Sequence, residues 1–416
     1  MSAYFRDFSS RFRALWGESR YRTDIKQFVE FGAGYFVVLI IGYLLLRKIN
    51  LVLTDVEMGK FSYVQSLVMI VAPVLYFAAP QAYLRFHEEH CISKRLRSFL
   101  MPLYWFAFAV LSMIIYWKTC SAWALAYALY PFFMEKTYFL RAQMEVRKLN
   151  VLRTIELLMP LAALYVMPLR TTAFADCILG LYGLGYAMSF LFAARNMGDS
   201  AIDRGDVVRY LAPLVFTSLL AVLLSNVAVV AVKHYWGYQA AGQMGVAVRS
   251  LLFMRSLSAL FLMFFPMIYF REARKGNFGV VRLYRSVVVG TVVLFAAALA
   301  VFAPFVYRIL GASAYLDSVN LFRVLVVAEL ANFMIDVYCL YFALEIKTWK
   351  GTIVKTVSLM VVIGGLGAIP WLTLAENRRL MYVAITVLFA AVVSAMFGGI
   401  WALVGERSYM KGGKWK

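Results

Sequence analysis

Long apolar runs alternate with short charged segments along the whole chain. A helix needs about 20 apolar residues to cross a hydrocarbon core of roughly 30 Å, whereas barrel strands would show alternating segments of about ten residues. The pattern therefore predicts an all-α integral membrane protein with about 12 transmembrane helices. The predicted spans, with approximate ends, are residues 27–46, 61–84, 98–117, 121–140, 151–167, 172–194, 209–232, 241–266, 286–307, 319–343, 352–374 and 380–403.

The composition supports a membrane protein over a soluble one. Hydrophobic residues make up 63% of the 416 residues, and the mean hydropathy is +0.75, well outside the range of soluble domains. A formal net charge of +20 could suggest nucleic-acid binding, but the basic residues are spread over many loops instead of one patch or stripe. We therefore expect membrane lipids as partners, and no nucleic acid.

The distribution of charge predicts the topology. An even number of spans places both termini on one side, and most of the 42 Lys and Arg residues fall in segments that would then be cytoplasmic, as the positive-inside rule requires. Residues 1–26 are polar and basic, without the apolar core of a signal peptide. We expect a cytoplasmic basic segment at 1–26, a cytoplasmic basic tail at 404–416, and both termini in the cytoplasm.

A weak internal repeat divides the chain in two. Residues 55–64 follow the first span and lead into the second, while residues 238–247 follow the seventh and lead into the eighth. An offset of six spans is even, so the halves would be parallel repeats about an axis along the membrane normal. The repeat predicts six-helix bundles at 27–194 and 209–403, joined by a polar cytoplasmic linker at 195–208.

Two arginines, Arg249 and Arg255, lie inside the apolar span 241–266. A charge at membrane depth costs several kcal/mol, on the order of 2.5–3.5 by insertion measurements, unless a cavity or a partner compensates it. One interpretation is a cationic cavity for a phosphate-bearing substrate, because guanidinium bonds phosphate oxygens in bidentate fashion. For Arg255 the alternative is a structural ion pair with Glu329; Arg249 has no obvious partner.

Further charges lie within the predicted spans. Lys136 and Arg323 either contribute to the cavity or extend toward the head groups. Glu329 and Asp336 are seven residues apart and so share nearly the same helix face. They could form a cation or proton relay, because a desolvated carboxylate can exchange protons as access alternates, or they could be salt-bridge partners. Glu135 is a third candidate for ion or proton coupling.

The sequence lacks the usual signs of catalysis or metal binding. The four cysteines are far apart, and His87 and His90 do not have the His-Glu-x-x-His spacing of a helical metal site. The predicted external loops are short, the longest being 47–60, whereas a membrane glycan polymerase or ligase needs an extended loop or an acidic catalytic cluster. We therefore expect a protein that is not an enzyme and that uses neither cofactor nor metal.

The chain resembles the polysaccharide flippases of the multidrug/oligosaccharidyl-lipid/polysaccharide exporter superfamily, in particular the Wzx-type flippases of O-antigen and capsule units. The resemblance covers nearly the whole chain. The chain departs from the family pattern at Ala228-Val229, where many relatives carry an acidic residue followed by Arg. The segments that carry it are 53–62 (LTDVEMGKFS), 82–86 (AYLRF), 210–214 (YLAPL), 241–247 (AGQMGVA), 309–315 (ILGASAY) and 321–325 (LFRVL).

The resemblance implies a MATE-like, two-bundle transporter of the bacterial inner membrane. Its cargo would be a polyprenyl-pyrophosphate-linked oligosaccharide, moved by alternating access through a cationic cavity, with polysaccharide polymerase or export machinery as possible partners. A small-molecule or drug exporter of the same superfamily is the nearest alternative and would require an acidic cavity for cationic cargo; a glycan polymerase or ligase is the third. The candidate cavity residues are Arg249, Arg255, Arg85, Lys136 and Arg323.

Overall fold

A computed structural model describes residues 19–88, 91–143, 145–166, 174–192, 197–198, 203–274, 277–344, 348–372 and 376–412. Apart from three short strands, these residues are helical or lie in turns between helices. The first half contains α2 (Ser19–Val52), α3 (Asp55–Leu75), α4 (Pro80–Arg85), α5 (Lys94–Thr119), η1 (Trp123–Leu129), α6 (Tyr130–Ala142), α7 (Val146–Val166), α8 (Phe174–Ala187) and η2 (Met188–Leu191). The second half contains α9 (Arg204–Ser250), α10 (Leu252–Arg274), α11 (Phe278–Val301), α12 (Ala303–Ile309), η3 (Ser313–Ser318), α13 (Val319–Leu344), α14 (Thr348–Gly367), η4 (Ile369–Trp371) and α15 (Glu376–Gly412).

Helices make up most of the described part of every predicted span, so the all-α membrane fold is confirmed. Within the described residues, nine helices are long and apolar enough to cross a membrane, and two shorter apolar helices accompany them. The count of nine differs from twelve partly because α9 alone contains one whole predicted span and the start of the next. The spans 121–140 and 172–194 differ for another reason, because each divides into a short α-helix and a 3₁₀ segment.

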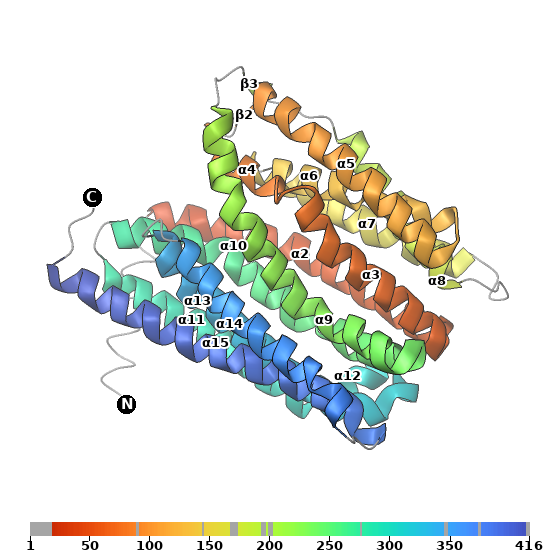
Figure 1. Ribbon diagram of the computed structural model, residues 1–416. Helices are drawn as coiled ribbons and strands as arrows, with labels where there is room; N and C mark the ends of the chain where they lie inside the picture. The colour runs from red at the N-terminus through yellow and green to blue at the C-terminus, as the bar shows by residue number, and fades with distance from the viewer. Residues whose placement is uncertain are drawn as a thin grey trace.

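The helices form two bundles. In the first, α2 packs on α7, while α7 and α6 contact α8. In the second, α15 packs between α13 and α14, and α11 lies against α10 and α13. Figure 1 shows the two groups on either side of the crossing between α3 and α9. The predicted linker 195–208 lies partly outside the described residues, and its last residues already belong to α9.

The crossing of α3 and α9 is the tightest helix contact between the bundles. A Cβ atom on Gly59 would overlap the carbonyl of Tyr238, and one on Gly242 would overlap the carbonyl of Asp55. Glycine is required at both positions because the two backbones touch there, as at close helix crossings in membranes. The two halves of the predicted repeat, 55–64 and 238–247, therefore pack directly on each other.

The helical path is interrupted at two places, one inside the predicted span 61–84 and one between the predicted spans 209–232 and 241–266. Between α3 and α4, Phe77 and Ala78 have positive φ values of 52° and 49°, so the span 61–84 divides into two helices after Pro73. In α9, Gly237 has a φ of 82°, a conformation that residues with a Cβ rarely adopt. Gly237 reverses the direction of the chain, so the helix leaves one predicted span and enters the next.

A small sheet, which we did not predict, joins the two halves at the predicted cytoplasmic side. Strand β1 (His87–Glu88) pairs antiparallel with β2 (Cys91–Ser93), and β2 pairs in parallel with β3 (Met197–Gly198). We predicted a loop around His87, and the two strands there are only a few residues long. The sheet places the start of α5 beside the chain that leads into α9.

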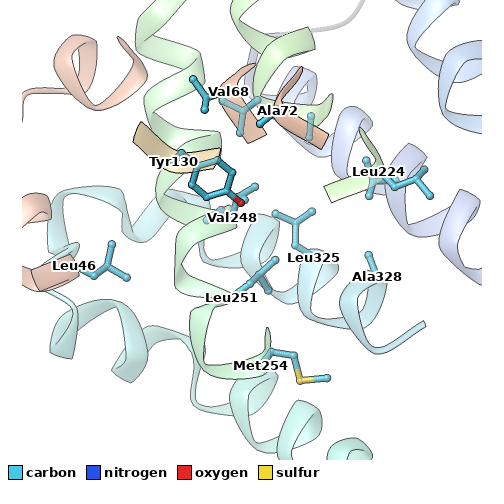
Figure 2. Packing of buried hydrophobic residues seen from close by; sticks show 14 of the residues in the cluster. Leu46, Val68, Ala72, Tyr130, Leu224, Val248, Leu251, Met254, Leu325 and Ala328 are labelled. Atoms are coloured by element: carbon cyan, nitrogen blue, oxygen red, sulfur yellow. The ribbon is translucent and has the colours of Figure 1, made fainter. Parts of the chain in front are cut away.

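Buried apolar side chains fill the contact between α9, α10 and α13. Figure 2 shows Val248, Leu251 and Met254 in the same region as Leu325 and Ala328 of α13. All five are at most 8% exposed. The helices α9 and α10 thus pack on α13 of the same bundle through apolar side chains.

Candidate functional site

A cavity of about 690 Å³ lies between the two bundles. Its walls come from α2, α3, α6, α7 and α8 of the first bundle and from α9 and α10 of the second. The polar groups among the described lining residues are Tyr35, Ser62, Gln65, Ser66, Thr137, Tyr138, Arg141, Asn150, Arg153, Glu156, Tyr182, Tyr186, Asn226, Arg249, Arg255 and Ser256. Neutral hydrogen-bonding groups and tyrosine rings therefore surround the charged ones.

The charge of the described lining is predominantly positive. Arg141 lies on α6, Arg153 on α7, Arg249 near the end of α9 and Arg255 on α10, while Glu156 of α7 is the one carboxylate among the described lining residues. Guanidinium groups remain protonated in proteins. The cavity therefore favours anionic groups and disfavours cations.

Arg249 has neutral partners. Its Nη2 donates to Oε1 of Gln65 at 3.1 Å, its Nη1 lies 3.3 Å from Sδ of Met58, and its guanidinium stacks 3.9 Å from the ring centre of Phe61. No carboxylate of the described residues lies within 4 Å of Arg249. An amide and a ring hold the guanidinium in place without neutralising it, so its charge is available to a ligand.

Arg255 lines the same cavity and has a carboxylate partner. Its Nε lies 3.3 Å from Oε1 of Glu329 on α13, and its Nη2 lies 3.4 Å from Oε2. The side chains are 33% and 17% exposed respectively. Arg255 therefore lines the cavity and also forms the ion pair with Glu329 that links α10 to α13, so the two interpretations of this residue are compatible.

Two further arginines line the cavity, and our sequence analysis missed them. Arg153 contacts Glu156 one turn later on α7, at 3.4 Å, and lies over the ring of Phe133. Arg141 stacks near Tyr138 on α6. Both lie at predicted span ends, where positive charges are ordinary. The spacing of Asn150 and Arg153 at i and i+3 places both on one face of the helix, and this polar pair was the available signal.

Three predicted cavity residues are not among the described lining residues. Arg85 is exposed at the end of α4. Lys136 is 5% exposed and packs near the ring of Phe139. Arg323 donates from Nε to the carbonyl of Ala300 at 3.0 Å and from Nη1 to Asn320. Arg323 therefore binds the end of α11. None of the three residues is among the described residues of the cavity wall, which corrects our assignment of them to it.

The candidate coupling residues all have cationic neighbours. Glu135 is buried and accepts from Nε of Arg97 at 3.0 Å, with the hydroxyl of Tyr83 at 3.4 Å. Asp336 lies 3.2 Å from Nζ of Lys355 on α14. Glu329 binds Arg255, as described above, so the structure separates Glu329 and Asp336 into two ion pairs.

Contacts between the bundles border the cavity on the predicted external side. Its lining there includes Ile49, Phe61 and Gly245, close to the crossing of Gly59 and Gly242. Beyond that point, Nδ2 of Asn50 donates to the carbonyl of Leu310, and the hydroxyl of Tyr315 donates to Asp55 at 2.7 Å. At the other end, Arg141 and Leu149 line the cavity next to the predicted cytoplasmic loop.

The comparisons with known proteins agree with this architecture. No family model matches the chain, and no curated protein matches it. Several solved structures, however, are similar to it. An inward-facing multidrug resistance MATE family transporter of the MOP superfamily has a TM-score of 0.65 at 14% identity over 91% of this chain and 100% of that one.

Two further structures are similar. One is a MOP superfamily transporter from Pyrococcus furiosus, described as having a binding pocket of reverse polarity, with a TM-score of 0.65, 14% identity and coverage of 94% of this chain and 97% of that one. The other is MATE in the straight conformation, with a TM-score of 0.62, 13% identity and coverage of 94% and 97%. The chain therefore has the two-bundle fold of the MATE transporters.

Proposed function

We propose that this protein is a transporter that moves an anionic, lipid-linked oligosaccharide across the membrane by alternating access. The arginines of the cavity would receive the pyrophosphate, the amides and tyrosines would contact the sugars, and the lipid chain would stay in the bilayer. The observation that carries this proposal is the charge of the cavity, four arginines against one glutamate among the described lining residues.

Arg249 is the residue we expect to bind the phosphate. It lines the cavity one helical turn from Gly245, beside the α3–α9 crossing, and its described partners are neutral. A charge-assisted hydrogen bond from a desolvated guanidinium is roughly twice as strong as a neutral one. A substrate that reaches Arg249 would therefore gain most there, and rocking of the bundles about the α3–α9 crossing would then expose it to the other side.

A small-molecule exporter is the second candidate, and the fold favours it equally. One of the similar structures is described as a multidrug resistance transporter. A cationic drug would have to enter a cavity whose described charges are mainly positive, at an electrostatic cost. An exporter of this fold would therefore be expected to carry anionic or neutral compounds.

The test is translocation in proteoliposomes of a fluorescent polyprenyl-pyrophosphate oligosaccharide. We expect Arg249→Gln to slow transport at least about tenfold, because losing one charge-assisted hydrogen bond costs about 1.5–3 kcal/mol and each 1.4 kcal/mol is tenfold. The matched control is Arg147→Gln, which removes an exposed arginine of α7 that is not among the described lining residues. Unfolding temperatures of both variants should stay close to the wild type.

The same vesicles distinguish the two candidates. Transport of the lipid-linked sugar by wild type and Arg147→Gln, with loss in Arg249→Gln, supports the flippase. Efflux of anionic dyes in the absence of any lipid-linked transport would support the exporter instead. Equal lipid-linked transport by Arg249→Gln and wild type would remove the proposed phosphate site.

A further inference from the structure

A second cationic pocket lies outside the central cavity, on the predicted cytoplasmic side. It has a volume of about 580 Å³ and is formed by the beginnings of α5 and α9. Its cationic side chains are Lys94, Arg95 and Arg204, and its described lining includes no carboxylate. Phe99 and Arg204 also line a neighbouring pocket, together with Asp203, Asp206 and Arg209.

The small sheet explains why these cations lie together. Ser93, the last residue of β2, directly precedes α5 and pairs with Gly198 of β3. Strand β3 in turn lies a few residues before α9. Lys94 and Arg95 are therefore held near Arg204, although more than one hundred residues separate them in the sequence.

The beginning of α5 favours an anion. Its first turn contains no acidic residue, and a helix N-terminus carries partial positive charge that an anion stabilises. A phosphate group in the pocket would be attracted both to this helix terminus and to the guanidinium groups of Arg95 and Arg204.

The pocket is apolar on the side toward the bilayer. The guanidinium of Arg204 lies 5.7 Å from the ring centre of Phe99, and Leu96, Pro102 and Val207 complete the wall. Further along α5 toward the bilayer, Trp105 and Phe106 are 58% and 57% exposed, as expected of lipid-facing residues. A cationic rim beside an apolar wall matches a molecule that has a phosphate head and a hydrocarbon chain.

We propose that the pocket formed by Lys94, Arg95, Ser98, Phe99, Pro102 and Arg204 binds the phosphate head group of an anionic phospholipid from the cytoplasmic leaflet. Basic residues at a membrane surface attract anionic lipids, and three of them with a stacked ring make a defined site. Because α5 belongs to the first bundle and α9 to the second, the bound lipid links the bundles and stabilises the arrangement seen here. This site is separate from the central cavity and does not depend on the cargo.

Native mass spectrometry of the full-length protein in detergent tests the site. The probe is dioleoyl phosphatidylglycerol, compared with zwitterionic dioleoyl phosphatidylcholine and with water-soluble glycerol 1-phosphate. We expect phosphatidylglycerol adducts on the wild type, with apparent affinity reduced about fivefold in Arg95→Gln and in Arg204→Gln, the scale expected for one basic residue at a membrane surface. Arg147→Gln, an exposed arginine of α7, should bind as the wild type does.

Each outcome bears on the proposal. Weaker phosphatidylglycerol binding by Arg95→Gln and Arg204→Gln, with unchanged binding by Arg147→Gln, supports it. Equal binding by all variants, or equal binding of phosphatidylcholine, would overturn it, because the cations would then contribute nothing. Glycerol 1-phosphate binding as tightly as the lipid would also overturn it and would indicate a site for soluble phosphate compounds. The readout is binding, so a failure of the proposed transport function would leave this result unaffected.

Discussion

Arg255 and Glu329 form a half-buried ion pair at the wall of the cavity, and a double-mutant cycle can measure its contribution. Removing either partner leaves a charge at membrane depth without compensation, so Arg255→Gln and Glu329→Gln should each lower stability, by about 1 kcal/mol given the partial exposure of both groups. Because the lost interaction is shared, the double variant should be more stable than the sum of the single losses predicts. The measurement is thermal unfolding in detergent.

The same variants separate the structural role of Arg255 from binding. If Arg255→Gln abolishes transport while the double variant regains stability but not transport, Arg255 also contacts cargo. Additive stability losses would show that the pair contributes nothing and that the two residues act independently.

Glu135 is a buried carboxylate held in an ion pair. It is 3% exposed and bonded to Arg97, and the buried Lys136 follows it in the chain. Breaking a buried pair by removing one partner costs about 3–5 kcal/mol, so Glu135→Gln should lower the unfolding temperature markedly. Thermal unfolding checks this, with Glu145→Gln on the nearby loop as a milder control. A variant that folds normally but loses gradient-driven transport would instead support coupling at Glu135.

Individual residues were predictable where the apolar background made a charge conspicuous. Arg249 and Arg255 are conspicuous within 241–266, and the suggested Arg255–Glu329 pair is present in the structure. Arg141 and Arg153 were missed because charges at helix ends are common and indicate nothing alone. Arg323 was placed wrongly because its carbonyl partner Ala300 is on another helix, and the sequence does not show that contact.

At the scale of elements, the α3–α9 crossing should depend on the absence of side chains at Gly59 and Gly242. Replacing Gly59 by Ala introduces a Cβ that overlaps the Tyr238 carbonyl, so the helices must separate, at a cost of about 1–3 kcal/mol. Spin labels at Val56 and Gln239, in a background whose four cysteines are replaced by serine, should report a longer and broader distance distribution.

The matched control is Gly290→Ala on α11, where a Cβ would meet nothing within 4 Å. This variant should leave the distance unchanged and be neutral or slightly stabilising, because Ala favours helices more than Gly does. An unchanged distance in Gly59→Ala would show that the crossing tolerates a methyl group and is looser than described.

The sequence predicted the positions of the helices better than it predicted which helices pack against each other. Apolar length locates helices because the bilayer fixes how long a span must be. The break at Phe77–Ala78 was not predicted, because a helix break inside an apolar stretch leaves no mark on hydropathy. The reversal at Gly237, in contrast, lies in the predicted connection between the spans 209–232 and 241–266. The repeat indicated that Gly59 and Gly242 hold equivalent positions, and only the fold shows that they touch each other.

At the scale of the whole molecule, the orientation in the membrane remains a prediction that one native residue can test. Cys120 ends α5 with a left-handed backbone conformation and is exposed, and the predicted topology places it on the external side. A membrane-impermeant maleimide applied to intact spheroplasts should therefore label the wild type and fail to label Cys120→Ser, provided that both are expressed equally. Labelling of Cys120 only after the membrane is permeabilised would invert the topology. The cationic pocket of α5 and α9 would then face outward and the cavity would open to the outside, so the direction of transport and the leaflet of the proposed lipid both depend on this result.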